Sequence, residues 1–307
     1  MKRLVVALGL FTTCLLGAFL STFRASPLPA RAPLSAAWPQ ANPPESMAMF
    51  RLTTGTVPRS AAVAYRGGSF FDKRDFAMTA VLVKHPAGDL LIDTGLGRDI
   101  AKQIRQMPWA FRAVTPYVQQ RAAADQLATA HYDLTQLHAI ILTHAHWDHV
   151  SGVLDFPDIP VLVTAAERRY VRDGGWIMAV ARNVQDVKYT EYQFDRGPYL
   201  GFARSHDVYN DGAVVIVPAP GHTPGSVIVF VTLANGAHYA FVGDLAWQRE
   251  GITQREERPW LPRVLADDDP AQVRENLRRM SAIASSFPAL QIVPAHDARG
   301  FAEIPTL

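Results

Sequence analysis

The run Thr143-His-Ala-His-Trp-Asp-His-Val-Ser-Gly152 places three histidines and an aspartate within six positions. Neutral imidazole and carboxylate groups are common ligands of Zn²⁺, and imidazole also suits iron and nickel. The preceding residues, 138–143, are apolar and β-branched, which predicts a buried strand. His144 and His146 would then point the same way, because side-chain direction alternates along an extended backbone. The run therefore predicts a metal site on the loop that leaves a strand.

Three later segments repeat the pattern of a polar side chain after an apolar run. His222 lies in a loop rich in glycine and proline, residues 218–226, while Asp244 and His296 follow apolar runs directly. Taken singly, a turn histidine or an aspartate beside a strand is usually structural. Together with the first motif, they place polar groups at the carboxyl ends of predicted strands, where α/β proteins commonly bind ligands.

In order and spacing, these motifs resemble the metallo-β-lactamase-fold superfamily of metallohydrolases, and the resemblance covers residues 48–307. It implies an α/β fold with a four-layer αββα sandwich and a small-molecule substrate. It also implies two metal ions held by seven side chains: His144, His146 and His222 on one ion, Asp148, His149 and His296 on the other, and Asp244 bridging them.

Asp93, in Leu90-Leu-Ile-Asp-Thr-Gly95, matches an early Asp-Thr-Gly of the family. The resemblance implies that it supports a ligand histidine or a turn near the metals. A turn-forming aspartate without that role is the alternative.

The resemblance implies two Zn²⁺ ions, or Mn, Fe or Co, with a water between them that is acidified to hydroxide and attacks an electrophilic carbonyl or phosphorus. Asp148 would be both a ligand and the carboxylate that moves a proton to the leaving group. Ligation without proton transfer is the alternative for Asp148.

The bridging position favours a lactone, ester or related acyl substrate. True β-lactamases of the superfamily generally lack the aspartate that matches Asp244, whereas the spacing from His222 to Asp244 is similar to the N-acyl-homoserine lactonase branch. That branch usually has a tyrosine where this chain has Trp247. Trp247 would then either form a wall of the substrate pocket or donate its indole N–H to the substrate.

Two other classes of function stay open. One is a phosphodiester hydrolase of the same fold, for which a basic groove is expected. The other is a mononuclear iron enzyme of sulfur or oxygen chemistry, or a binding protein without turnover. Residues 1–46 hold four of the 30 Lys and Arg and one of the 28 Asp and Glu, so the remainder carries 26 basic and 27 acidic residues. This near-neutral domain predicts no nucleic-acid partner.

The N-terminus differs from the rest of the chain. Lys2 and Arg3 precede an apolar stretch, residues 4–20, which predicts either a signal peptide or a membrane anchor within residues 1–25. Either one implies export to the periplasm or secretion, with the N-terminus inside. Residues 26–47 contain six prolines and predict an extended tether. Cys14 is the only cysteine, so the domain can form no internal disulfide.

Local patterns predict several elements of the domain. We expect paired strands at 77–83 and 90–93, a strand at 161–163, and helices at 117–130, 165–172 and 270–287. Trp109, Phe111, Tyr117 and Trp176 would form either an apolar lid over the metals or part of the core. The other histidines match no ligand position: His85, His131, His138, His206 and His238.

Overall fold

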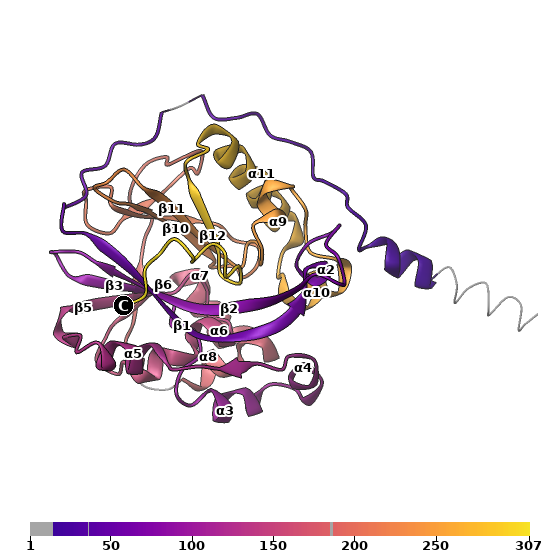
Figure 1. Cartoon of the computed structure of the whole chain (residues 1–307), viewed down its shortest axis with the longest axis horizontal. Coiled ribbons are helices and arrows are strands. Elements are labelled where there is room, and N and C mark those ends of the chain that lie inside the picture. The colour runs from indigo at the N-terminus through magenta and orange to yellow at the C-terminus, as the bar shows by residue number, and fades with distance from the viewer. Residues whose placement is uncertain (1–14, 36, 185–186) are drawn as a thin grey trace, which may run out of the picture.

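Two β-sheets pack face to face, and helices cover the outer side of each (Figure 1). The computed structural model describes residues 15–35, 37–184 and 187–307. Most of the predicted N-terminal apolar segment, residues 4–14, lies outside them. Residues 15–21 form a helix. Within the described ranges, no helix combines the length and the apolar character that a bilayer crossing needs.

The first sheet has seven strands, which lie in the spatial order β4 (Val118–Gln119), β1 (Ala48–Ser60), β2 (Lys73–Lys84), β3 (Asp89–Ile92), β5 (Leu137–Ile141), β6 (Val161–Thr164) and β7 (Tyr189–Tyr192). The second has five, in the order β12 (Gln291–Pro294), β11 (His238–Gly243), β10 (Val227–Thr232), β9 (Val214–Pro218) and β8 (His206–Asp207). Strands β3, β5, β6 and β7 run parallel, as do β11 and β12.

The helices of the described residues are mostly short. The α-helices are α2 (Ala61–Ala64), α3 (Ile100–Gln103), α4 (Trp109–Val114), α5 (Ala123–Thr129), α6 (Trp147–Val150), α7 (Ala165–Asp173), α8 (Ala179–Asn183), α9 (Glu250–Thr253), α10 (Trp260–Ala266) and α11 (Pro270–Ser286). The 3₁₀ helices are η1 (Ile104–Gln106), η2 (Leu134–Gln136), η3 (Ser151–Asp155) and η4 (Trp176–Met178).

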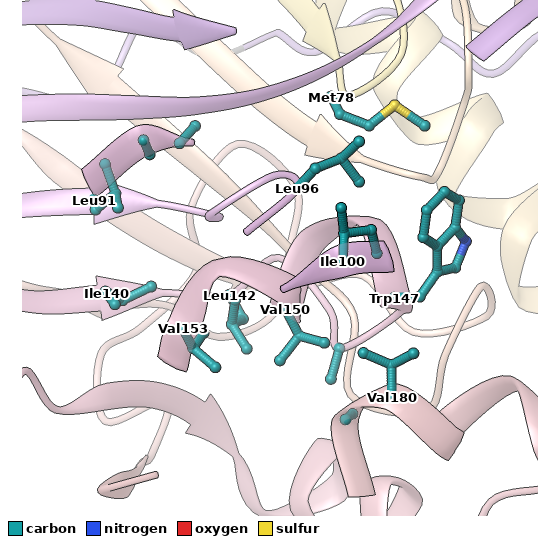
Figure 2. Packing of buried hydrophobic residues seen from close by; sticks show 14 of the residues in the cluster. Met78, Leu91, Leu96, Ile100, Ile140, Leu142, Trp147, Val150, Val153 and Val180 are labelled. Atoms are coloured by element: carbon teal, nitrogen blue, oxygen red, sulfur yellow. The ribbon is translucent and has the colours of Figure 1, made fainter. Parts of the chain in front are cut away.

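Strand β2 is apolar on both faces because both faces are covered. Val81 packs between the sheets against residues such as Ile216 of β9. Leu82, its neighbour, points to the opposite face and packs with Ile140 and the helices outside the first sheet. Figure 2 shows part of this outer layer, where Leu96 and Ile100 lie between Met78 and Val150 in one cluster of buried apolar side chains. A third cluster joins the second sheet to α11. The predicted four-layer αββα sandwich is confirmed.

Most local expectations match the structure. The predicted strands at 77–83 and 90–93 are parts of β2 and β3, which pair antiparallel. The helix predicted at 270–287 is α11, whose first N–H groups are capped by the carboxylate of Asp269.

The helix predicted at 117–130 is wrong in its first half. Residues Val118 and Gln119 form strand β4 beside Thr56 and Gly55 of β1, and helix α5 begins only at Ala123. Pairing with an open sheet edge satisfies these backbone groups, which overrides the helical pattern of the side chains.

Within the predicted tether, the described residues 26–35 and 37–46 follow the surface of the domain (Figure 1). The N–H of Leu28 donates to the carbonyl of Arg255 at 2.8 Å, and the N–H of Leu34 donates to Ser286 Oγ at 2.7 Å. Trp38 stacks on His238 with ring centroids 4.1 Å apart and meets Phe287 edge to face at 5.1 Å. This segment therefore covers part of the core behind the second sheet.

We predict that Trp38→Ala lowers the free energy of unfolding by about 2 kcal/mol, because it removes an indole packed on two aromatic rings. Chemical unfolding of the full chain measures the change. The control is Leu134→Ala, since Leu134 is 45% exposed and distant in sequence from this contact. Equal stability of the two variants would contradict a packed role for the segment.

Candidate metal centre

The two sheets bring the seven predicted ligand side chains to one edge of the sandwich. His144 and His146 lie between β5 and α6, and Asp148 and His149 lie in α6. His222 comes from the loop between β9 and β10, while Asp244 and His296 follow β11 and β12. All seven residues are buried, with at most 7% of their surface exposed.

Their ligand atoms converge on two neighbouring positions. His144, His146 and His222 form one group and Asp148, His149 and His296 another, with the atoms of each group within 4.8 Å of one another. Asp244 groups with His144 and His149, so it touches both sets. One of its carboxylate oxygens, Oδ1, lies 3.1 Å from His296 Nε2, and the other, Oδ2, lies 3.3 Å from His222 Nε2.

The donors at this centre fit metal ions. Buried polar atoms are almost always hydrogen-bonded, yet His144 Nε2, His149 Nε2 and Asp244 Oδ1 have no hydrogen-bond partner among the described residues. These three atoms belong to the predicted ligands. Because imidazole nitrogens and carboxylate oxygens are preferred by zinc and similar divalent metals, ligation satisfies the atoms that the protein leaves unpaired.

Burial and neighbouring charges shift the pKa values of the histidines in this centre. Burial lowers the pKa of His144 and of His146 well below the usual histidine value. For His149, burial opposes ionisation, but the Asp93 and Asp244 carboxylates raise its pKa well above that value. Without metal, imidazolium would have to balance the carboxylates; bound divalent cations supply the same positive charge.

Asp93 lies just beyond β3 and contacts a predicted ligand. Its backbone has φ +53°, a region that aspartate tolerates better than most residues. Asp93 Oδ2 accepts from His149 Nδ1 at 2.8 Å and from the hydroxyl of Thr143 at 2.8 Å, while Oδ1 accepts from the N–H of Thr143. Asp93 thus fixes the ring orientation of His149 and leaves its Nε2 facing the metal position.

Residues 75–296 match the sequence model of the metallo-beta-lactamase superfamily. The chain belongs to this superfamily. It is 30% identical to a probable metallo-hydrolase of Mycobacterium tuberculosis over 235 residues, which cover 71% of this chain and 73% of the relative. It is 26% identical to the N-acyl homoserine lactonase AttM of Agrobacterium fabrum over 220 residues, 70% of this chain and 80% of that protein. The expectation of a metal-dependent hydrolase is confirmed at this level.

Solved structures agree on the fold. An N-acyl homoserine lactone hydrolase with N-hexanoyl-L-homoserine bound superposes with a TM-score of 0.66 at 16% identity, over 84% of this chain and 96% of that one. The dizinc quorum-quenching lactonase AidC gives a TM-score of 0.58 at 17% identity, over 84% and 90% of the two chains. At these identities, the likeness concerns the metallo-β-lactamase fold.

A buried glutamate that the sequence motifs did not indicate joins the two ligand loops of this superfamily member. Glu167, in the first turn of α7, accepts through Oε1 from the N–H of Ala145, between His144 and His146, at 2.7 Å. Its Oε2 accepts from Thr223 Oγ1 at 2.6 Å and from the N–H of Gly225 at 3.1 Å. Burial raises the pKa of Glu167 to about 7, although all three donors favour the carboxylate.

Gly225 makes this contact possible. A Cβ at that position would lie 2.3 Å from the backbone nitrogen of Glu167, so any larger residue would push α7 away from the loop. From the sequence, Gly225 was expected to be a turn residue. In the structure, its lack of a side chain also lets the first turn of α7 pack closely against the loop.

A second carboxylate, also absent from the sequence motifs, orients His222. Asp267, at the end of α10, has a side chain only 1% exposed and accepts from His222 Nδ1 at 3.0 Å. The guanidinium of Arg258 donates to the same oxygen of Asp267 and, at 2.9 Å, to the backbone carbonyl of Asp244. Metal-ligating histidines usually donate their other N–H to a carboxylate. From the sequence, Asp267 could therefore have been named as one of many candidate acidic residues, but it could not have been distinguished from the others.

Trp247 lies in the wall of the centre. Its indole Nε1–H donates to Asp244 Oδ2 at 2.8 Å, and its ring lies under the guanidinium of Arg258, 4.9 Å from the charge centre. In this structure the indole N–H donates to Asp244, so it is not free to donate to a substrate. Of the two roles considered for Trp247, the structure therefore matches that of a wall residue.

An apolar pocket of about 300 Å³ opens onto the centre. Its floor includes His146, Asp148, His222, Asp244 and His296. Apolar side chains from β1, β2, α4, η4 and α10 form its walls, among them Val57, Phe76, Met78, Phe111, Ile177 and Leu261. For four aromatic residues, the sequence left open whether they form a lid over the metals or part of the core. Of these, Phe111 lines the pocket, and Trp109 is 75% exposed.

We predict that Glu167→Gln lowers the free energy of unfolding by about 1–3 kcal/mol, because an amide has one acceptor oxygen and in either orientation its NH₂ group faces a backbone N–H, that of Ala145 or that of Gly225. The same change should weaken metal retention, since the two ligand loops lose their common acceptor. Urea unfolding and metal content after dialysis measure the two effects. Glu191→Gln, on an exposed residue of β7, is the matched control and should alter neither quantity. Full metal retention in Glu167→Gln would rule out the positioning role.

We also predict that Asp267→Asn weakens metal binding by about 10–100-fold, as expected when the carboxylate behind a ligand histidine is neutralised. Competition with a chromogenic chelator measures the affinity. The neighbouring Asp268→Asn serves as control because Asp268 is exposed. Identical affinities of the two variants would show that Asp267 does not tune His222.

Proposed function

We propose that this chain is a dinuclear metal-dependent hydrolase that opens a lactone or cleaves an ester bearing an apolar acyl group. The observation that carries the proposal is the apolar pocket whose floor consists of predicted metal ligands. An acyl chain would occupy the walls while the carbonyl reaches the floor. Burial of each methylene in such a pocket favours binding by about 0.8 kcal/mol.

The ligand set supports two ions. Seven side chains in two groups, with Asp244 in contact with both, exceed the four ligands that one tetrahedral zinc ion takes. We propose Zn²⁺, with Mn, Fe or Co as metals that the same donors accept. Two bound divalent ions supply an acidified water and a Lewis acid that polarises the substrate carbonyl.

The chain's own residues complete the chemistry. Asp148 lines the pocket, and its Oδ2 lies 3.4 Å from His296 Nε2, so its carboxylate would lie beside a substrate carbonyl bound at the floor. In the proposed reaction it accepts the proton released by the attacking water and passes it to the alkoxide that leaves. Trp247 and Phe76 exclude bulk water from this side of the centre.

The lining argues against a phosphodiester as the main substrate. Among the lining side chains, Arg59 alone is a lysine or arginine, so the pocket lacks the basic groove that a polyanion would need. A mononuclear iron enzyme would leave several of the seven buried donors without a partner, which is costly. The similarity to AttM makes N-acyl homoserine lactones the first substrates to test.

The decisive test is a panel of acyl-homoserine lactones, aryl esters, a cephalosporin and a bis-aryl phosphate, assayed with zinc-loaded enzyme. We expect hydrolysis of lactones or esters, with kcat/KM rising by up to about fourfold per added methylene until the pocket is full. His146→Ala should abolish turnover while its circular dichroism spectrum stays unchanged. Preferential turnover of the phosphate, or unchanged activity of His146→Ala, would refute the proposal.

A further inference from the structure

Large apolar side chains are exposed on one side of this protein, around the mouth of the pocket. Apart from Val118, Leu134, Leu154 and Leu307, every exposed large apolar residue in the described ranges falls on four segments: the N-terminal helix, the α2–β2 loop, α4 with η4, and α10. Soluble proteins seldom expose such residues together without a partner.

The helices at the mouth provide an apolar collar. We use this name for six residues: Trp109 and Val114 of α4, Trp176 of η4, and Trp260, Val264 and Leu265 of α10. Val114 and Leu265 also line the pocket, so the collar borders its opening. Phe111 packs on Trp176 with ring centroids 5.4 Å apart, which joins α4 to η4.

The exposed surface continues from the collar to the N-terminal helix. Glu257 forms ion pairs with Arg263 of α10 and with Arg66. Arg66 lies in the α2–β2 loop, which also carries Phe70 and Phe71. Phe71 is 94% exposed, and the Phe70 ring packs against Phe23 with the ring planes tilted by 49° and the centroids 5.0 Å apart. Phe23 follows the helix with the exposed Leu15, Leu16 and Leu20. In Figure 1 this helix, α2, α10 and α4 all lie toward the right of the molecule.

We propose that the collar docks on a lipid bilayer, so that the pocket opens toward the membrane surface. Three features favour lipid over a second copy of the chain. Three of the six collar residues are tryptophans, which prefer the membrane interface. Residues 100–117 contain Lys102, Arg105 and Arg112 but no acidic residue, as suits an anionic surface. The N-terminal helix, residues 15–21, is preceded in sequence by residues 4–14, which are apolar.

Docking in this orientation gives the proposed hydrolase direct access to acyl compounds dissolved in the bilayer. Such a substrate would pass from the acyl region between α4 and α10 to the metal floor without crossing bulk water. This consequence rests on the proposed function, whereas the docking itself does not. The test therefore measures membrane contact without turnover.

The experiment uses the full chain with Cys14→Ser, which removes the only cysteine. Single cysteines replace Val264, in the collar, or Leu134, an exposed apolar residue before the amino end of β5 and so away from the ligand loops. Each is labelled with an environment-sensitive fluorophore and mixed with vesicles of phosphatidylcholine and phosphatidylglycerol, with or without bromine on the acyl chains. We expect a blue shift and bromine quenching for the label at 264 and neither for the label at 134.

A second variant separates the collar from the N-terminal segment. Trp109→Ser with Trp260→Ser, in the Val264→Cys chain, should reduce quenching by about tenfold or more, because two exposed indoles that docking would bury in lipid are removed. Metal content should be unchanged, since neither tryptophan lines the pocket.

Three outcomes would overturn the proposal. Equal responses of the labels at 264 and 134 would mean that the N-terminal segment tethers the domain to the vesicle and that the collar does not contact the bilayer. Protection of the label at 264 without vesicles, together with a dimer in analytical ultracentrifugation, would mean that a second copy covers the collar. Absence of vesicle binding would exclude lipid contact. A negative substrate panel with positive quenching would instead reject only the proposed function.

Discussion

The structure depends on the convergence of seven buried imidazole and carboxylate side chains where the two sheets meet. Four come from the chain after β5, and three come from loops of the second sheet. Every ligand group combines residues that follow β5 with one residue of the second sheet, which is His222, Asp244 or His296. The two sheets must therefore hold a fixed relative position for the donors to share their ions, and bound ions would in turn hold the sheets together.

Rigidity at this junction comes from buried carboxylates that contact the ligands or their loops. Asp93 holds His149, Asp267 holds His222, and Glu167 links the backbone on both sides of the junction. Each carboxylate accepts from N–H or O–H donors, Asp93 and Glu167 through both oxygens and Asp267 through Oδ1, which offsets the cost of burying it. Ligand geometry is thus set by hydrogen bonds that cross between elements distant in sequence.

The pocket and the collar extend the same arrangement outward. The long β1–β2 pair provides one wall, while short helices provide the other, and those helices keep tryptophans on their outer faces. An apolar pocket that leads from an apolar surface to a polar metal floor suits a substrate with the same division between acyl chain and carbonyl. The binding of an acyl substrate in the pocket and the docking of the collar on a bilayer would then have the same physical cause, the transfer of apolar surface out of water.

Much of the fold and the ligand set followed from sequence because their causes are local. Alternating or continuous apolar runs gave the strands β2, β3 and β5, and the density of His and Asp in residues 143–149 indicated a metal before any contact was known. Helix α11 could be predicted from its capping aspartate and proline. Residues 117–130 could not, because pairing of β4 with β1 is decided by an edge formed from residues far away in sequence.

Tertiary structure alone decided which other carboxylates support the centre and which apolar residues stay exposed. Glu167 lies in helix α7 and Asp267 directly follows α10, and only packing brings them to the ligand loops. Trp109 and Phe111 have the same apolar character in sequence, yet one is exposed and the other lines the pocket. Sequence fixes the chemical type of each side chain, whereas burial and contact depend on the relative placement of both sheets and their helices.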